Sequence, residues 1–145
     1  MSVLPVTGVA HAVSFFHSST NVAIVTANQV VTISDIGGGA VPKVLWTNPD
    51  DTVDSGSQFA VGVGASSDNS RLTVAANTGA LFTFDVATGE GKAADCGCAP
   101  TSLAGLGGSL FRLTGANAGA LKVFDAATNE IWMVPLAVAA DGGQQ

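Results

Sequence analysis

Short apolar runs alternate with clusters of Gly, Asn, Asp and Ser along the whole chain. The runs at 71–76 and 80–85, for example, flank a triplet at 77–79 that reads Asn-Thr-Gly. Because Asn and Gly tolerate a positive φ, this triplet predicts a short hairpin loop between two strands. The runs lack strict alternation of apolar and polar residues, which indicates strands buried on both faces. We therefore predict an all-β fold.

The same pattern recurs along the chain as an internal repeat. The clearest copy spans residues 66–90, a second spans 108–130, and a weaker one spans 18–36. Each copy has an aspartate that closes a strand, and we interpret these aspartates as equivalent. They are Asp35, Asp85 and Asp125, spaced 50 and then 40 residues apart. A period of this length, built from short strands, is typical of β-propeller blades.

Each unit is predicted to form one blade of four antiparallel strands. The expected strands are 9–15, 22–27, 29–35 and 43–46 in the first unit, 59–65, 71–76, 80–85 and 92–96 in the second, and 101–106, 110–116, 120–125 and 131–134 in the third. The corresponding blades are expected at 5–50, 57–97 and 99–135, and 136–145 is expected to begin a fourth blade.

A second turn follows the strand-closing aspartate in the two clearer units. Its left-handed position is expected at Gly89 in one unit and at Asn129 in the other, and the side chain of Asp85 or Asp125 can bind amides of its own turn. Recurrence at the same turn favours a structural cap over a catalytic acid at these aspartates.

The repeat resembles the YVTN-type β-propeller repeat over nearly the whole chain, in three copies of which the second and third are strong. The segments that carry the resemblance are Pro100–Leu103, Leu110–Thr114, Leu121–Asp125 and Thr128–Glu130. The first unit departs from the pattern, because 37–42 replaces the Ala-Thr-Gly turn. The resemblance implies a propeller fold and suggests an extracellular or periplasmic location. Members of the family range from surface-layer and extracellular binding proteins to lactonase-like enzymes, so the resemblance does not settle the function.

Three blades are fewer than the four to eight of closed propellers. A three-bladed arc would leave an apolar face bare at each end, at or above the area that soluble monomers usually expose. The chain is then either a piece of a longer propeller or a protein whose copies complete the ring. We favour a homo-oligomer, with two chains closing a six-bladed ring and the trailing strand 136–139 adding to a neighbour's blade. The expected interface residues are Val9, Val13, Phe15, Val134, Leu136 and Val138.

The charge balance makes some partners improbable. Eleven acids against five bases give a net charge of −6, which argues against binding to nucleic acid or to an anionic membrane surface. The first 34 residues carry no Asp, Glu, Lys or Arg, but they lack the positive n-region of a signal peptide. Polar residues, Gly8 and Pro5 also break every window long enough to span a membrane.

Residues that could carry chemistry do not form a recognisable set. His11 and His17 would need a third metal ligand, and the acids Asp50, Asp51 and Asp54 match no EF-hand spacing. The pairs 18–19 and 66–67 are serines without a nucleophile elbow, and the glycines at 37–39 precede no Lys-Ser or Lys-Thr. We therefore predict no catalytic residue, no metal site and no cofactor.

Two further pairs are interpreted as structural. Trp46 and Trp132 are expected at equivalent places on outer strands, where packing between blades explains both. Cys96 and Cys98 are separated by one residue, so a disulfide between them would be strained, and two thiolates make at best half a zinc site. We expect two small side chains in a tight connection.

The leading functional hypothesis is a non-enzymatic binding or scaffold module that recognises copies of itself, with an unspecified protein or small-molecule ligand as a further partner. The alternative is a fragment of a lactonase-like or quinoprotein-like enzyme, whose acids and metal or cofactor would meet at the propeller axis. A third reading is a minimal propeller fragment.

Overall fold

The structure is a computed structural model that describes residues 8–27, 29–36, 38–47, 59–115 and 120–135. The described strands form three sheets of four. Blade 1 contains β1 (Ala10–Phe15), β2 (Val22–Thr26), β3 (Gln29–Ser34) and β4 (Val41–Thr47). Blade 2 contains β5 (Ala60–Ala65), β6 (Arg71–Ala76), β7 (Ala80–Asp85) and β8 (Gly91–Asp95). Blade 3 contains β9 (Pro100–Gly107), β10 (Leu110–Gly115), β11 (Ala120–Asp125) and β12 (Glu130–Pro135).

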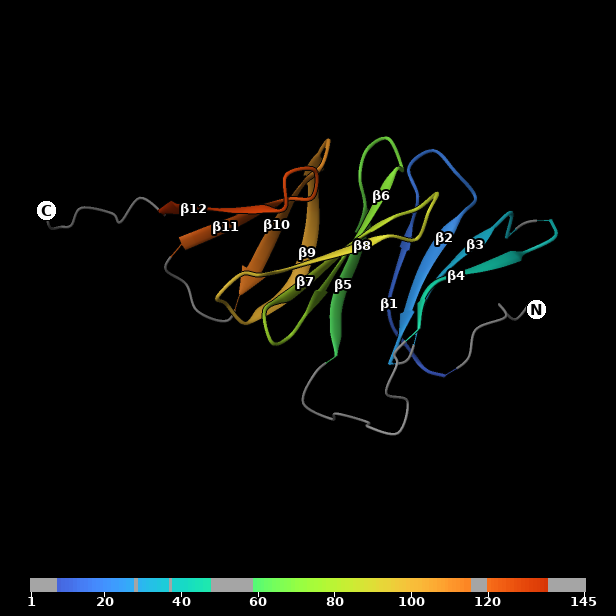
Figure 1. The fold of residues 1–145 in the computed structure, drawn as a ribbon, viewed down its shortest axis with the longest axis horizontal. Helices are drawn as coiled ribbons and strands as arrows, with labels where there is room; N and C mark the ends of the chain where they lie inside the picture. Colours follow the sequence, from blue (N-terminus) through green and yellow to red (C-terminus); the bar gives the residue numbers. More distant parts are fainter. Residues whose placement is uncertain (1–7, 28, 37, 48–58, 116–119, 136–145) are drawn as a thin grey trace, which may run out of the picture.

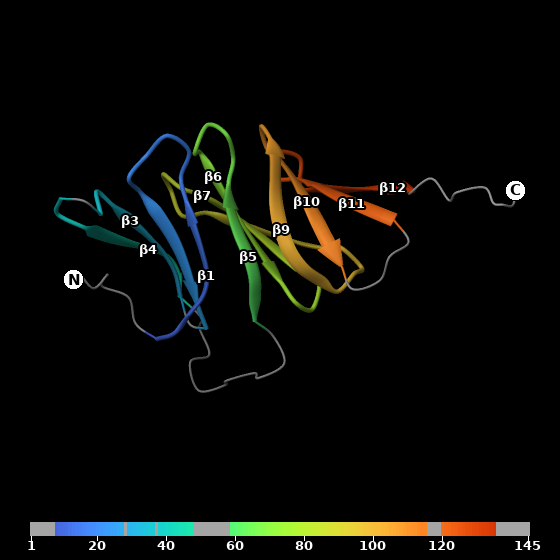
Figure 2. The same cartoon turned by 180° about the vertical axis from the view of Figure 1, so that it is seen from behind.

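Each sheet is an antiparallel meander, and the three sheets follow one another as an arc (Figure 1). The first strands of the blades, β1, β5 and β9, lie side by side, and β5 contacts both of the others (Figure 2). This is the arrangement of part of a β-propeller and confirms the predicted all-β fold of three four-stranded blades. The predicted trailing strand at 136–139 lies outside the described residues.

The observed strands agree closely with the prediction. β6, β7 and β11 have the predicted bounds, and most of the others differ by one residue at an end. The predicted turn residues have the expected conformation, since Gly89 has a φ of 80° and Asn129 a φ of 63°. The largest difference is β4, which begins two residues earlier than predicted.

The first unit is shifted by one residue from the predicted alignment. Val22 lies opposite Phe15 and Ile33, as Leu72 lies opposite Ala65 and Phe84 in blade 2. The residue after Ile33 is Ser34, so Ser34 and not Asp35 is the equivalent of Asp85.

A shorter hairpin explains this correction. Val25 pairs with Val30 in blade 1, whereas Ala75 pairs with Leu81 in blade 2, so the blade 1 loop is one residue shorter. Asp35 instead begins the β3–β4 turn with a φ of 54°.

Two apolar layers of the core lie at the junctions between blades, and a third buried cluster lies on the outer face of blade 1. The layer between blades 1 and 2 contains Ala23, Val25, Val30, Val63, Leu72, Val74 and Phe84. The layer between blades 2 and 3 contains Ala75, Leu81, Phe111, Leu113 and Phe124. Both faces of blade 2 are therefore buried, as the continuous apolar strands predicted.

Glycines allow β5 and blade 3 to approach closely. A Cβ at Gly62 would lie 2.8 Å from the Cβ of Leu103, and one at Gly64 would lie 2.8 Å from Phe111 Cε1. The contact at Gly62 is to a Cβ, so only glycine fits where β5 and β9 meet, whereas a side chain at Gly64 would require the Phe111 ring to shift.

Candidate functional sites at the blade junctions

In blades 1 and 2, one row of side chains faces the next blade along the chain, and we call this row and its blade 3 equivalent the forward row. In chain order the forward rows are Ser14, Ala23, Thr32 and Lys43 in blade 1, Gly64, Thr73, Thr83 and Lys92 in blade 2, and Ala104, Arg112, Val123 and Trp132 in blade 3. The register therefore makes Lys43, Lys92 and Trp132 equivalent to one another.

Lys43 fastens blade 1 to blade 2. Its Nζ donates hydrogen bonds to the carbonyl oxygens of Val86 and Ala87, both at 2.9 Å, in the β7–β8 turn. Within blade 1, Thr32 Oγ1 donates to the carbonyl oxygen of Lys43 at 3.4 Å. The forward row of blade 1 thus ends in a latch across the junction.

Lys92 makes no such latch among the described residues. Counting from Asp85 and Asp125, the equivalents of Val86 and Ala87 are Ala126 and Ala127. Neither of these carbonyl oxygens receives a hydrogen bond from Lys92. The turn is held instead by Asn129, whose Nδ2 donates to the carbonyl oxygen of Ala93 at 3.1 Å.

A pocket of about 420 Å³ lies at this position between blades 2 and 3. Its lining residues are Arg71, Thr83, Asp85, Glu90, Gly91, Lys92 and Ala126. Two basic and two acidic side chains line it, so its formal charge is balanced.

Three buried side-chain atoms at this junction have no hydrogen-bond partner. Within the described part of the chain, these unpartnered atoms are Thr73 Oγ1, Thr83 Oγ1 and Asn129 Oδ1. Thr83 lines the pocket, Thr73 is its cross-strand neighbour, and Asn129 binds the residue after Lys92. All three residues therefore lie at the second junction, and Thr83 is the one that lines the pocket.

The turns between the first and second strands also link neighbouring blades. The backbone amide of His17 donates to Asn69 Oδ1 at 2.8 Å, and Asn69 Nδ2 donates to the carbonyl oxygen of His17 at 2.9 Å. At the next junction, Ser67 N donates to the Gly108 carbonyl oxygen, and Gly108 N donates to Ser67 Oγ.

The histidines do not converge on a metal site. His17 Nε2 lies 3.0 Å from the carbonyl oxygen of Ala65, while His11 stacks on Phe59. No group of three metal-ligating side chains occurs among the residues that the structure describes. The acids Asp50, Asp51 and Asp54, and the residue Gly37, lie outside that part.

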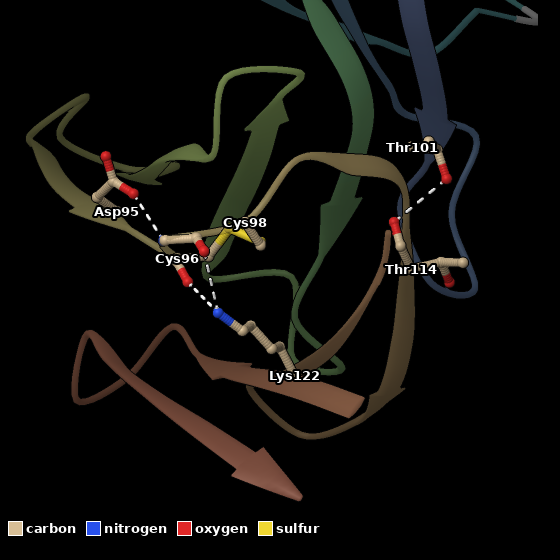
Figure 3. Close-up of a disulfide and its surroundings, with 7 residues drawn as sticks. Asp95, Cys96, Cys98, Thr101, Thr114 and Lys122 are labelled. Carbon is tan, nitrogen blue, oxygen red and sulfur yellow. Dashed lines mark hydrogen bonds between the residues drawn. A yellow bond between two sulfur atoms is a disulfide. The ribbon is translucent and has the colours of Figure 1, made fainter. Parts of the chain in front are cut away.

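The cysteines form a disulfide, which corrects the prediction of two free side chains (Figure 3). The Cα atoms of Cys96 and Cys98 are 5.1 Å apart, within the usual span of a disulfide. Gly97 has a φ of 58°, and this left-handed conformation turns the chain tightly enough to bring the two sulfurs together.

Lys122 of blade 3 binds the disulfide turn of blade 2. Its Nζ donates to the carbonyl oxygens of Cys96 at 2.6 Å and Gly97 at 3.3 Å (Figure 3). Asp95 Oδ1 accepts the amide of Gly97 at 2.7 Å and so stabilises the turn. This contact fastens the second junction beyond the end of β8, whereas the pocket lies at the start of that strand.

Asp85 and Asp125 cap the turns that follow their strands, as predicted. Asp85 Oδ1 accepts the amides of Ala87 and Thr88, and the Thr88 amide lowers the pKa of Asp85. Asp125 accepts the hydroxyl of Ser109 at 2.6 Å, which lowers the pKa of Asp125.

Asp68 organises the preceding turn of blade 2. The hydroxyls of Ser66 and Ser70 donate to its carboxylate, both at 2.7 Å, and lower the pKa of Asp68 to about 2. Serines 66 and 70 are therefore engaged with this carboxylate.

The free face of blade 1 is apolar. Its two central cross-strand rows are Phe15, Val22, Ile33 and Pro42, and Val13, Ile24, Val31 and Val44. The residues from β2 and β3 are buried, with Ile36 and Ala40 packed against them. Val13 and Phe15, both predicted interface residues, are 55% and 60% exposed.

The free face of blade 3 has a different character. Exposed Arg112 occupies the place of Ala23 and Thr73, which are fully buried in the other two blades. Val134, a predicted interface residue, lies on this face beside Trp132 and is 47% exposed. Val9 is exposed before β1, while Leu136 and Val138 lie outside the described residues.

The tryptophans are not equivalent, contrary to the prediction. Trp46 lies opposite Val30, whose counterpart in blade 3 is Leu121, and Leu121 lies opposite Val134. Trp132 corresponds to Lys43. The one-residue shift of the first unit and a bulge in β4 explain the difference.

The sequence did not identify Lys43, Lys122 and Asn129 as residues that bind across a junction, or Arg112 as a residue of the outer face of blade 3. A signal was present for Lys43, Arg112 and Lys122. Only five Lys and Arg occur in the chain, and these three lie within predicted strands. What each side chain contacts depends on the neighbouring blade, and the pattern along one strand carries no information about that blade.

Solved structures with the same fold include proteins of different kinds. A match to Kuenenia stuttgartiensis hydrazine synthase has a TM-score of 0.66 and 10% identity, over 94% of this chain and 38% of that chain. The β-propeller domain of Myceliophteria thermophila Cps50 (Swd1) matches with a TM-score of 0.68 and 12% identity, over 94% of this chain and 41% of that chain. A nidogen/laminin complex matches with a TM-score of 0.58 and 14% identity, over 80% of this chain and 43% of that chain.

These likenesses establish a β-propeller fold. The chain spans about two-fifths of the length of each of these matched chains. No family model matches the sequence, so the YVTN-type resemblance is not confirmed. No curated protein matches either. Among the described residues there is no helix long and apolar enough to cross a membrane.

Proposed function

We propose that this chain is a non-enzymatic binding or scaffold module that associates with a second copy of itself to close a propeller ring. The matched structures include an enzyme, hydrazine synthase, so the fold does not choose between binding and catalysis. The proposal is supported by the side chains of Lys43, Asn69 and Lys122, which bind the turns of a neighbouring blade.

The free face of blade 1 is the observation that carries this proposal. Its Val22, Ile24, Val31 and Ile33 are the register equivalents of Leu72, Val74, Phe82 and Phe84, with which blade 2 packs on blade 1. In blade 1 these four residues are already buried, with Ile36 and Ala40 packed against them. Exposed Val13 and Phe15 are the apolar area that contact with another blade would remove from water.

Arg112 limits the strength of the association. A blade 3 face that packs on a copy's blade 1 face would bury the guanidinium opposite two rows of apolar side chains. Burial of a charge without a partner costs several kcal/mol. We therefore expect a dimer that dissociates on dilution rather than a permanent one.

The test is absolute mass by light scattering over a range of protein concentrations. The proposal predicts a discrete dimer at high concentration, a monomer for Phe15→Asp, and dimerisation at concentrations at least about tenfold lower for Arg112→Ala. Phe59→Asp is the matched control, because Phe59 is a similarly exposed phenylalanine (46%) beside the middle blade. A wild-type monomer at every concentration would refute self-association.

A further inference from the structure

The polar region between blades 2 and 3 contains more hydrogen-bonding capacity than the chain itself uses. The hydroxyls of Thr73 and Thr83 and Asn129 Oδ1 are buried without partners. Thr73 is 0% and Thr83 5% exposed. A buried polar group without a partner costs about 1–3 kcal/mol, so several in one place indicate a missing partner molecule.

We propose that this pocket binds a small polyhydroxylated molecule, of monosaccharide size. Its volume of about 420 Å³ falls within the usual range of small-molecule sites. The site lies within one chain, so it does not depend on whether copies of the protein associate.

The chemistry of the lining selects hydroxyl groups. Among the lining groups, the ionised carboxylates of Asp85 and Glu90 only accept hydrogen bonds, whereas Arg71 and Lys92 only donate. A hydroxyl both donates and accepts, so a polyol can satisfy both kinds of group at once. An anion would face Asp85 and Glu90, while a cation would face Arg71 and Lys92.

Asn129 explains why the pocket is open. Its counterpart in the β7–β8 turn is Gly89, where a Cβ would already lie 3.6 Å from the carbonyl oxygen of Leu45. The Asn129 side chain instead stands between the β11–β12 turn and β8, bridging to Ala93. The turn is kept away from Lys92, and the latch that Lys43 makes at the first junction does not form.

The test is a titration of the full chain followed by amide NMR chemical shifts. The probes are D-glucose, D-galactose, D-mannose and myo-inositol, each alone, with sodium acetate and sodium phosphate as anionic comparisons. For ligands of this size we expect dissociation constants in the millimolar range. The expected result is a saturable shift, with at least one polyol, that is largest for the amides of Thr83, Lys92 and Asn129.

Two variants separate this site from a general effect on the surface. Asn129→Gly should close the pocket and abolish the shift while the protein stays folded, because Asn129 has a positive φ that glycine adopts freely. Thr83→Val should weaken binding at least tenfold, whereas the matched variant Thr32→Val at the first junction should leave it unchanged.

Several outcomes would overturn the proposal. If no polyol causes a saturable shift, the unpartnered atoms are satisfied by water alone. Saturation by acetate or phosphate but by no polyol would contradict the ligand class. Equal binding by wild type and Asn129→Gly would place the ligand somewhere else.

Discussion

The two junctions inside this chain are built on the same register but fastened differently. At the first, Lys43 donates to two carbonyl oxygens of the following turn, and Thr32 donates within its own blade. At the second, the equivalent Lys92 and Thr83 make no such bonds, and a pocket lies between the blades.

The difference shows how a repeat can hold one architecture while its junctions diverge. The apolar layer is retained at both junctions and is sufficient to stack the blades. The polar rows beside it are then free to differ, because each contributes only about 0.5–1.5 kcal/mol per hydrogen bond. One junction uses them as a latch, and the other leaves them available.

The largest expected effect comes from the apolar layers. Phe84 and Phe124 are equivalent, and replacing either by Ala should reduce the free energy of unfolding by about 3–5 kcal/mol. Hydrogen exchange should show the loss in blade 3 first for Phe124→Ala, and at the first junction for Phe84→Ala. A cost below about 1 kcal/mol at either site would contradict the claim that both layers stack the blades.

Replacing the equivalent lysines of the two junctions should have clearly different effects on the free energy of unfolding. Lys43→Met removes two hydrogen bonds from a charged donor and should lower the free energy of unfolding by about 1–2 kcal/mol. Lys92→Met should change it by less than about 0.5 kcal/mol. Denaturant unfolding of both variants measures the difference, and equal costs would remove the distinction between the latched and the open junction.

Replacing the two equivalent threonines by valine should change the stability of the protein in opposite directions. Thr32→Val removes a donated hydrogen bond and should destabilise the protein by about 0.5–1 kcal/mol. Thr83→Val removes an unpartnered buried hydroxyl and should stabilise the ligand-free protein by about 1 kcal/mol. Thermal unfolding without added polyol compares the two, and a loss of stability for Thr83→Val would mean that its hydroxyl already has a partner.

Acid should weaken the turns at both junctions. The pKa values of Asp68, Asp85 and Asp125 are lowered in the folded chain, so their contribution to stability is present above the ordinary carboxyl pKa of 3.8. It is lost as pH falls from there toward about 2, the pKa of Asp68. Unfolding midpoints measured across this range should fall more steeply for the wild type than for Asp68→Asn.

The sequence predicted the blades well where turn residues mark both ends of a strand. β6 and β7 are bounded by Asn-Thr-Gly and by the turn that ends in Gly89, and their bounds were correct. The first unit was misaligned, because its β2–β3 loop is one residue shorter and nothing in the composition marks the missing residue.

The sites were harder to predict, because they depend on contacts between blades. The latch needs the Val86 carbonyl oxygen to face Lys43, and those residues are 43 positions apart. The disulfide was discounted because the short spacing suggested strain, whereas the left-handed Gly97 allows the turn. The capping aspartates were found because a local turn contains both the carboxylate and the amides.

A crystal structure of the Asn129→Gly variant tests most directly whether Asn129 keeps the second junction open. We predict that Lys92 Nζ will bind the carbonyl oxygens of Ala126 and Ala127 at about the 2.9 Å seen for Lys43, with the pocket closed. An unchanged pocket, with Lys92 still unlatched in the absence of the Asn129 side chain, would contradict this explanation of how the two junctions differ.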